Sequence, residues 1–85
     1  MPKISEFFGI SIYMYFSDHN PPHLHARYGE FTAELDFSGR TLVGKLPPRV
    51  LGLVVEWITM HNRELMEDWE LARKQAPLKP IKPLE

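Results

Sequence analysis

Two histidines with one residue between them give the clearest chemical signal in this 85-residue sequence. His23 and His25 lie in residues 23–28, where apolar and polar residues alternate as they do in a half-buried strand. Side chains two residues apart on a strand project from the same face, so we expect both imidazoles to point the same way. Since imidazole transfers protons and binds transition metals near neutral pH, this pair is the first candidate for a functional site.

A tight hairpin is expected to set carboxylates opposite the two histidines. Residues 29–30, Gly-Glu, suit the central positions of a type II′ turn, which has glycine first. Counting outward from this turn pairs His25 with Glu34. The same count pairs His23 with Asp36. The hairpin therefore predicts two histidine–carboxylate pairs.

Further polar residues are expected on the same sheet face. The β-branched and aromatic run over residues 10–16 predicts a preceding strand, and keeping its apolar residues in the core turns its two tyrosines to the polar side. Two prolines in residues 18–22 end that strand in a loop. The candidate functional face consists of Tyr13, Tyr15, His23, His25, Arg27, Glu34 and Asp36, with Asp18 and His19 in the adjoining loop.

Three interpretations of this face stay open. Paired histidines and carboxylates on an exposed sheet can be ordinary surface residues that discourage aggregation. They can also bind a divalent transition metal, with His23 and His25 as ligands. His19, Glu34 or Asp36 would then complete the site. No cofactor other than such a metal is indicated.

The third interpretation is acid–base or anion chemistry, or a protein interface. A histidine held by a carboxylate could move protons while Arg27 binds a phosphate. Tyr13 or Tyr15 could stack on an RNA base. Tyrosine and arginine are equally the usual anchors of protein interfaces, so a protein partner stays open. The sequence contains no phosphate-binding loop, dinucleotide fingerprint, nucleophile elbow or helical metalloprotease motif, so it does not decide whether the chain is an enzyme.

The strands that must position these residues predict an α+β fold. Alternation marks residues 10–16, 23–28 and 31–37, and more weakly residues 41–46. The expected sheet is three- to four-stranded and antiparallel. Its unpaired edges also make a homodimer plausible, although a partner chain would occupy the same edges.

A long helix is predicted to cover the apolar face of the sheet. Pro47 and Pro48 suit its first turn, and apolar residues recur at helical spacing to about Gln75. A helix this long in so small a protein is a candidate for a break near Met60 to Asn62. The polar sheet face is then either open to water or covered by another chain.

Residues 1–76 are predicted to form one domain, and residues 77–85 a proline-rich C-terminal tail. The tail repeats proline every third residue, which matches the three residues per turn of polyproline II. Three arrangements of the tail stay open: a strap across its own domain, a segment that docks on a partner, or a frayed end.

Composition excludes several classes of protein. With 44% hydrophobic and 25% charged residues the chain is an ordinary globular protein, and with no cysteine it has no disulfide and no thiolate metal site. Its longest apolar stretch, residues 50–55, is far shorter than the roughly 20 residues that span a bilayer, and we expect a cytoplasmic protein. A formal net charge of −1 gives no overall attraction to nucleic acid.

The sequence also resembles a known family, the bacterial domain of unknown function 4160. The residues that carry the resemblance are Ile12 to Tyr15, Asp18 to Glu30, Gly39-Arg40, Gly44 to Pro47, Arg49, Trp57, His61, Glu64-Leu65 and Trp69. The resemblance covers nearly the whole chain. It implies a small bacterial protein of toxin–antitoxin type that pairs with a small partner protein, with a role on RNA or in regulation, and it implies no catalytic residue.

Overall fold

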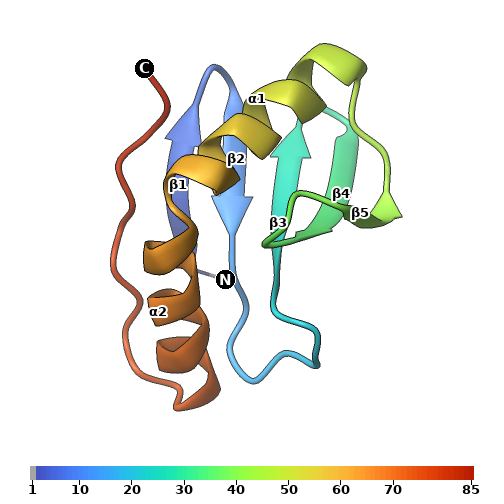
Figure 1. Ribbon diagram of the computed structural model, residues 1–85. Helices are drawn as coiled ribbons and strands as arrows, with labels where there is room; N and C mark the ends of the chain where they lie inside the picture. Colours follow the sequence, from blue (N-terminus) through green and yellow to red (C-terminus); the bar gives the residue numbers. More distant parts are fainter. Residues whose placement is uncertain (1) are drawn as a thin grey trace.

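Five strands follow one another in the sheet in the same order as in the chain (Figure 1). The computed structural model describes residues 2–85, so the first residue of the predicted domain, Met1, lies outside the described residues. The strands are β1 (Lys3–Phe7), β2 (Ile10–Tyr13), β3 (His23–Tyr28), β4 (Phe31–Asp36) and β5 (Thr41–Gly44). All neighbours are antiparallel, which places β1 and β5 at the two edges.

The prediction of three to four strands was wrong, because it missed β1. A register shift between Lys3 and Ser5 interrupts the pairing of β1 with β2, and Ile4 and Ser5 are both buried. Such a bulge removes the alternation of apolar and polar residues on which the prediction depended. The turn that joins the two strands also hides the hairpin, since Phe8 occupies a position with φ of 52° where glycine or asparagine is usual.

The predicted register of the central hairpin is confirmed. His25 lies opposite Glu34 and His23 opposite Asp36 in the pairing of β3 with β4. On the other side of β3, Tyr13 of β2 lies opposite His25. The two histidines, Tyr13 and the two carboxylates are therefore on neighbouring strands, β2, β3 and β4.

The C-terminal half of the fold is helical, but it is not one helix. α1 (Pro48–Met60) and α2 (Asn62–Arg73) meet at His61, so the predicted long helix is divided into two at the position where the sequence left a break open. The side-chain amide of Asn62 donates to the backbone carbonyl of Phe37, just after β4. This bond ties the start of α2 to the end of the central hairpin.

The core lies between the helices and one face of the sheet, as Figure 1 shows for α1. It contains Ile4, Phe7, Ile10, Ile12, Met14, Leu24, Ala26, Ala33, Leu35, Phe37, Leu46, Val50, Val54, Trp57, Ile58, Leu65, Trp69, Ala72, Ile81 and Leu84. Trp57 from α1 and Trp69 from α2 are its two largest buried side chains. Helix and sheet thus bury their apolar faces against each other and leave the second sheet face without a helical cover.

Residues 77–85 strap the domain along β1 and α2 (Figure 1, red). Ile81 and Leu84 are buried in the core, and the Ile81 N–H donates to the carbonyl of Ile4 in β1. The indole N–H of Trp57 donates to the carbonyl of Lys82 across 2.9 Å. The strap therefore covers part of the β1 edge and leaves β5 as the more open edge.

Within residues 2–85, neither helix combines the length and the apolar character that a membrane crossing requires.

Candidate functional site

The Asp18 carboxylate joins two histidines of β3 at one end of the sheet. Its Oδ2 lies 3.0 Å from Nε2 of His23 and accepts a hydrogen bond from Nε2 of His25 across 3.2 Å. Asp18 reaches them from the loop between β2 and β3, which is tied to α2 by a hydrogen bond from the Ser17 N–H to the Ala72 carbonyl. We call Asp18, His23 and His25 the histidine–aspartate cluster.

His23 is the buried member of the histidine–aspartate cluster, with 1% of its side chain exposed. Its Nδ1 lies 2.7 Å from the Pro21 carbonyl oxygen, which can only accept, so Nδ1 carries the proton. Nε2 is close to Asp18 but the geometry is not that of a hydrogen bond, and among residues 2–85 this buried nitrogen has no hydrogen-bond partner. The ring of Trp69 lies 5.5 Å away and helps to cover it.

His25 is the accessible member of the histidine–aspartate cluster, since 22% of its side chain is exposed. The ring of Tyr15 meets it edge to face with 4.2 Å between centroids. The two imidazoles of His23 and His25 are 5.1 Å apart. His25 thus presents the cluster to the sheet face that the helices leave open.

Asp18 is ionised more readily than a free aspartate. Burial raises the pKa of its carboxyl, but hydrogen bonds from His25 and from the His19 N–H, with the neighbouring imidazoles, outweigh burial and leave the pKa below its usual value. The His19 ring also approaches Oδ1 to 3.0 Å, yet 78% of that side chain is exposed. His19 is therefore a solvent-exposed neighbour of the cluster.

Of the two carboxylates of β4, only Glu34 lies close to the cluster. Glu34 Oε1 lies 3.6 Å from Nε2 of His23, on the open side of the cluster. Asp36 turns away, and its Oδ1 accepts from the N–H and hydroxyl of Ser38 and from the N–H of Arg40. The Ser38 hydroxyl is the main cause that lowers the pKa of Asp36, against the opposing effect of burial. Asp36 stabilises the β4–β5 turn instead of joining the cluster.

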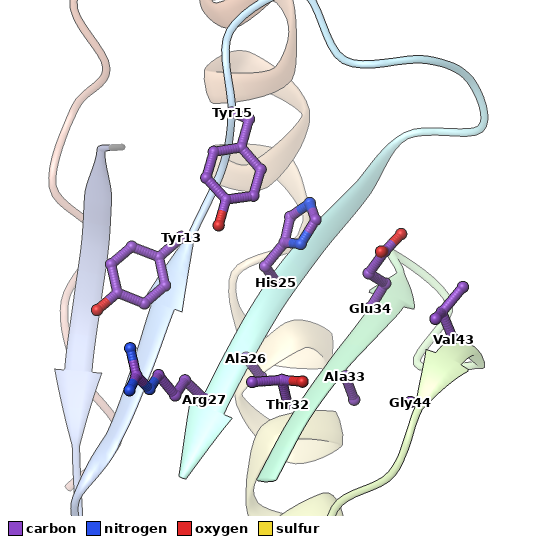
Figure 2. Close-up of a pocket in the computed structure, with 10 residues that line it drawn as sticks. All are labelled: Tyr13, Tyr15, His25, Ala26, Arg27, Thr32, Ala33, Glu34, Val43 and Gly44. Carbon is purple, nitrogen blue, oxygen red and sulfur yellow. The ribbon is translucent and has the colours of Figure 1, made fainter. Parts of the chain in front are cut away.

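Tyr13, Tyr15 and Arg27 lie beside the cluster around a hollow in the open sheet face (Figure 2). His25 and Glu34 line the same hollow. The predicted face is thus divided into a histidine–aspartate cluster at the end of the sheet and a hollow next to it.

The cluster has the donors and spacing that a transition metal needs. One donor atom each from Asp18, His23 and His25 lies within 4.8 Å of the others. Zinc bonds of about 2.0–2.1 Å at tetrahedral angles set donor atoms about 3.3 Å apart. The separations of 3.0 and 3.2 Å from the Asp18 oxygen are already close to that value.

Sequence reasoning placed Asp18 on the candidate face but did not identify it as a ligand. Its side chain comes from an irregular loop, and alternation says nothing about where a loop folds back. The contact of Trp69 with His23 was missed as well, because it joins α2 to β3 across the core. The only signal in the sequence was Asp18 next to His19, just ahead of the two strand histidines.

The fold and the site define a small α+β protein with a histidine–aspartate cluster at one end of an antiparallel sheet. A protein-family model described as "Domain of unknown function (DUF4160)" matches residues 9–70, well over half of the chain, and the chain belongs to this family. The comparison confirms the resemblance seen in the sequence. A search of curated proteins and a search of solved structures each gave no significant match.

Proposed function

We propose that this chain binds one divalent transition metal ion between Asp18, His23 and His25. The observation that carries the proposal is Nε2 of His23, a buried nitrogen without a hydrogen-bond partner that lies 3.0 Å from the Asp18 carboxylate. A buried polar atom of this kind costs free energy unless something binds it. A metal ion would satisfy that nitrogen and neutralise Asp18 at the same time.

The hydrogen bond from His23 to Pro21 supports the same proposal. Metal-bound histidines usually donate their other ring N–H to a carbonyl or carboxylate, which fixes the tautomer and the ring orientation. Here Nδ1 of His23 already does so across 2.7 Å, which leaves the Nε2 lone pair for a ligand. This nitrogen is therefore oriented for a metal before any metal binds.

Two imidazoles and one carboxylate suit zinc, and also iron or nickel. Three protein ligands leave a coordination position open, as in catalytic rather than structural zinc sites. Glu34, 3.6 Å from Nε2 of His23, is close enough to become a fourth ligand or to hold a metal-bound water. The proposal is thus a metal site that remains accessible to a ligand from the open sheet face.

Calorimetric titration of the untagged, metal-free protein with Zn²⁺, Ni²⁺ and Fe²⁺ near neutral pH tests the proposal. We expect binding of one equivalent of at least one metal and loss of that binding in His25→Ala and Asp18→Asn. His25 is partly exposed, so its variant keeps the buried packing that His23→Ala would disturb.

The matched control is His61→Ala. His61 lies between α1 and α2 and pairs with Glu64 across 2.6 Å, so its loss removes one of the four histidines without touching the cluster. Binding that survives in both cluster variants, or no binding at one equivalent, would contradict the metal site.

A second proposal comes from the family resemblance: the chain pairs with a small partner protein in a toxin–antitoxin type module and acts on RNA. The supporting observation is the open sheet face, which ends at the β5 edge, where 57% of Val43 is exposed. Large apolar side chains that water reaches at a sheet edge are typical of surfaces that a partner covers.

A pulldown of the untagged protein from its own cells, with protein, RNA and metal content measured in the eluate, tests this second proposal. We expect a small protein in stoichiometric amount in the eluate. Val43→Asp should abolish its capture. The control is Met60→Asp at the end of α1, where the side chain is 61% exposed, and it should leave the capture unchanged. An eluate with metal but neither protein nor RNA would refute the pairing and leave the metal site as the function.

A further inference from the structure

The hollow beside the histidine–aspartate cluster has the size of a small ligand. Its volume is about 170 Å³. Sites for drug-sized molecules usually have about 300–1,000 Å³, so this one accommodates a ligand of one ring or a few groups. Its lining residues are Tyr13, Tyr15, His25, Ala26, Arg27, Thr32, Ala33, Glu34, Val43 and Gly44.

Gly44 allows β5 to approach β4 closely where both strands line the hollow. The Gly44 backbone approaches β4 so closely that a Cβ there would lie 2.2 Å from the Thr32 carbonyl oxygen. No other residue fits this position without displacing the strands. The two alanines direct their side chains into the core, where they are 1% and 4% exposed, so the floor there is backbone.

Hydrogen-bond donors gather on one side of the hollow. In Figure 2 the Tyr15 hydroxyl points into the space between Tyr13 and His25, and Arg27 extends next to Tyr13. Arg27 has no carboxylate within ion-pair distance in the part of the chain that the structure describes, whereas Arg73 pairs with Glu70. A guanidinium with a phenol hydroxyl beside it is a donor set suited to a carboxylate or phosphate.

The other side of the hollow has the opposite character. Glu34 and His25 line it there, and both contact the histidine–aspartate cluster. His25 and Arg27 are two residues apart on β3, which sets their Cα atoms roughly 6.6 Å apart. One ligand of modest length therefore reaches from the guanidinium to the edge of the cluster.

We propose that this hollow binds a small organic anion, whose carboxylate or phosphate contacts Arg27 and the neighbouring Tyr13 hydroxyl while its other end faces the Tyr15 hydroxyl and His25. The Arg27 contact goes beyond the proposed metal site and does not need it. A contact between the ligand's other end and a metal ion beside His25 would rest on the proposed function.

NMR titration of the full ¹⁵N-labelled chain tests the inference, first metal-free and then with one equivalent of Zn²⁺. The probes are phenyl phosphate, benzoate and the neutral benzyl alcohol. We expect saturable shifts in β2 and β3 with the anions and none with the alcohol. Comparison of the two dissociation constants shows whether the site prefers a phosphate or a carboxylate.

Variants assign the contact. Arg27→Ala removes a charge-assisted pair and should weaken binding of the preferred anion by about 10-fold or more. Tyr13→Phe removes one hydroxyl and should weaken it by a few-fold, roughly 2- to 10-fold. The matched control is Arg63→Ala, an exposed arginine of α2, which should bind as the native chain does.

Each result bears on one hypothesis. Anion binding that depends on Arg27 in the metal-free chain supports the inference even if zinc does not bind. Absence of saturable shifts at millimolar concentration, equal binding of the neutral alcohol, or anion binding that needs zinc and ignores Arg27→Ala would each overturn it.

Discussion

His23 donates its Nδ1–H to the Pro21 carbonyl oxygen across 2.7 Å, and this bond decides what the other ring nitrogen can do. With the proton on Nδ1, the neutral ring presents an Nε2 lone pair toward Asp18. The bond comes from the loop between β2 and β3, two residues before His23. The loop therefore supplies both Asp18 and the carbonyl that orients His23.

Trp69 should report metal binding by its fluorescence. Its ring lies 5.5 Å from His23, so a metal ion on Nε2 changes the charge beside the indole. We expect tryptophan emission to change on addition of Zn²⁺ and to saturate at one equivalent. The measurement is an emission titration of the metal-free protein at neutral pH.

Trp57 provides the matched control for that titration. It is also buried next to a histidine, 5.5 Å from His61, but that histidine is outside the cluster. Trp57→Phe should keep the zinc-dependent change and Trp69→Phe should lose it. The reverse pattern would place the metal away from His23.

Substitution by alanine should change the free energy of unfolding in opposite directions at Gly44 and at Gly52. Gly44 has φ of +82°, and an added Cβ would lie 2.2 Å from the Thr32 carbonyl oxygen. Left-handed backbone alone costs other residues about 1–2 kcal/mol, so Gly44→Ala should lower the free energy of unfolding by more than this amount. The measurement is chemical denaturation followed by circular dichroism.

Gly52 is the control for that substitution, since it lies within α1, and among the described residues an added Cβ would meet nothing within 4 Å beyond the adjacent backbone of its own helix. Gly52→Ala should raise the free energy of unfolding by about 0.5–1 kcal/mol through helix propensity. If Gly44→Ala were as stable as Gly52→Ala, β5 would not approach β4 as closely in solution.

The central hairpin was predictable from the sequence because each of its signals was local. The turn at residues 29–30 and the clean alternation on both sides specify one register, and β3 and β4 have it. Length made a helix break near residues 60–62 a candidate, but no proline or glycine there specifies one. β1 was not, because its bulge and the left-handed Phe8 remove the pattern that marks a hairpin.

The site was predictable only in part, for a related reason. Strand pairing placed Asp36 opposite His23, but its side chain had better donors in the next turn, at Ser38 and Arg40. The carboxylate that does reach His23 is Asp18, which depends on the path of a loop. Backbone register can be counted along a strand, whereas the choice among hydrogen-bond donors depends on the folded chain.

The C-terminal strap should contribute to the stability of the domain. Ile81 is 4% exposed and belongs to the core. Truncating a buried isoleucine to alanine usually costs about 2–5 kcal/mol, and a segment at the surface can relax, so Ile81→Ala should fall near the lower end. Denaturant unfolding measures the loss.

Lys82→Ala separates packing from the backbone bond of the same segment. Its side chain is 70% exposed, and its carbonyl, which accepts from Trp57, remains in the variant. We expect a change within about 0.5 kcal/mol. Equal stability of Ile81→Ala and Lys82→Ala would mean that the strap does not pack on the domain in solution.

Asp68 should make the domain less stable as the pH rises through the acid range. Burial raises the pKa of its carboxyl above its usual value. The Lys79 N–H, which donates to Oδ1 across 2.9 Å, lowers this pKa, and the Glu67 charge raises it further. A raised pKa means that the folded chain holds this proton more tightly than the unfolded chain. The stabilisation is complete below the unfolded pKa and is lost as the pH rises through the folded one.

Asp68→Asn tests this because the amide oxygen can still accept from Lys79 but carries no charge. The difference in melting temperature, variant minus native, should grow as the pH increases from about 4 toward neutrality and then stay level. Thermal unfolding in a series of buffers measures it. A difference that stayed constant over this range, or that shrank with rising pH, would show that the Asp68 carboxyl titrates in the folded chain as it does in the unfolded one.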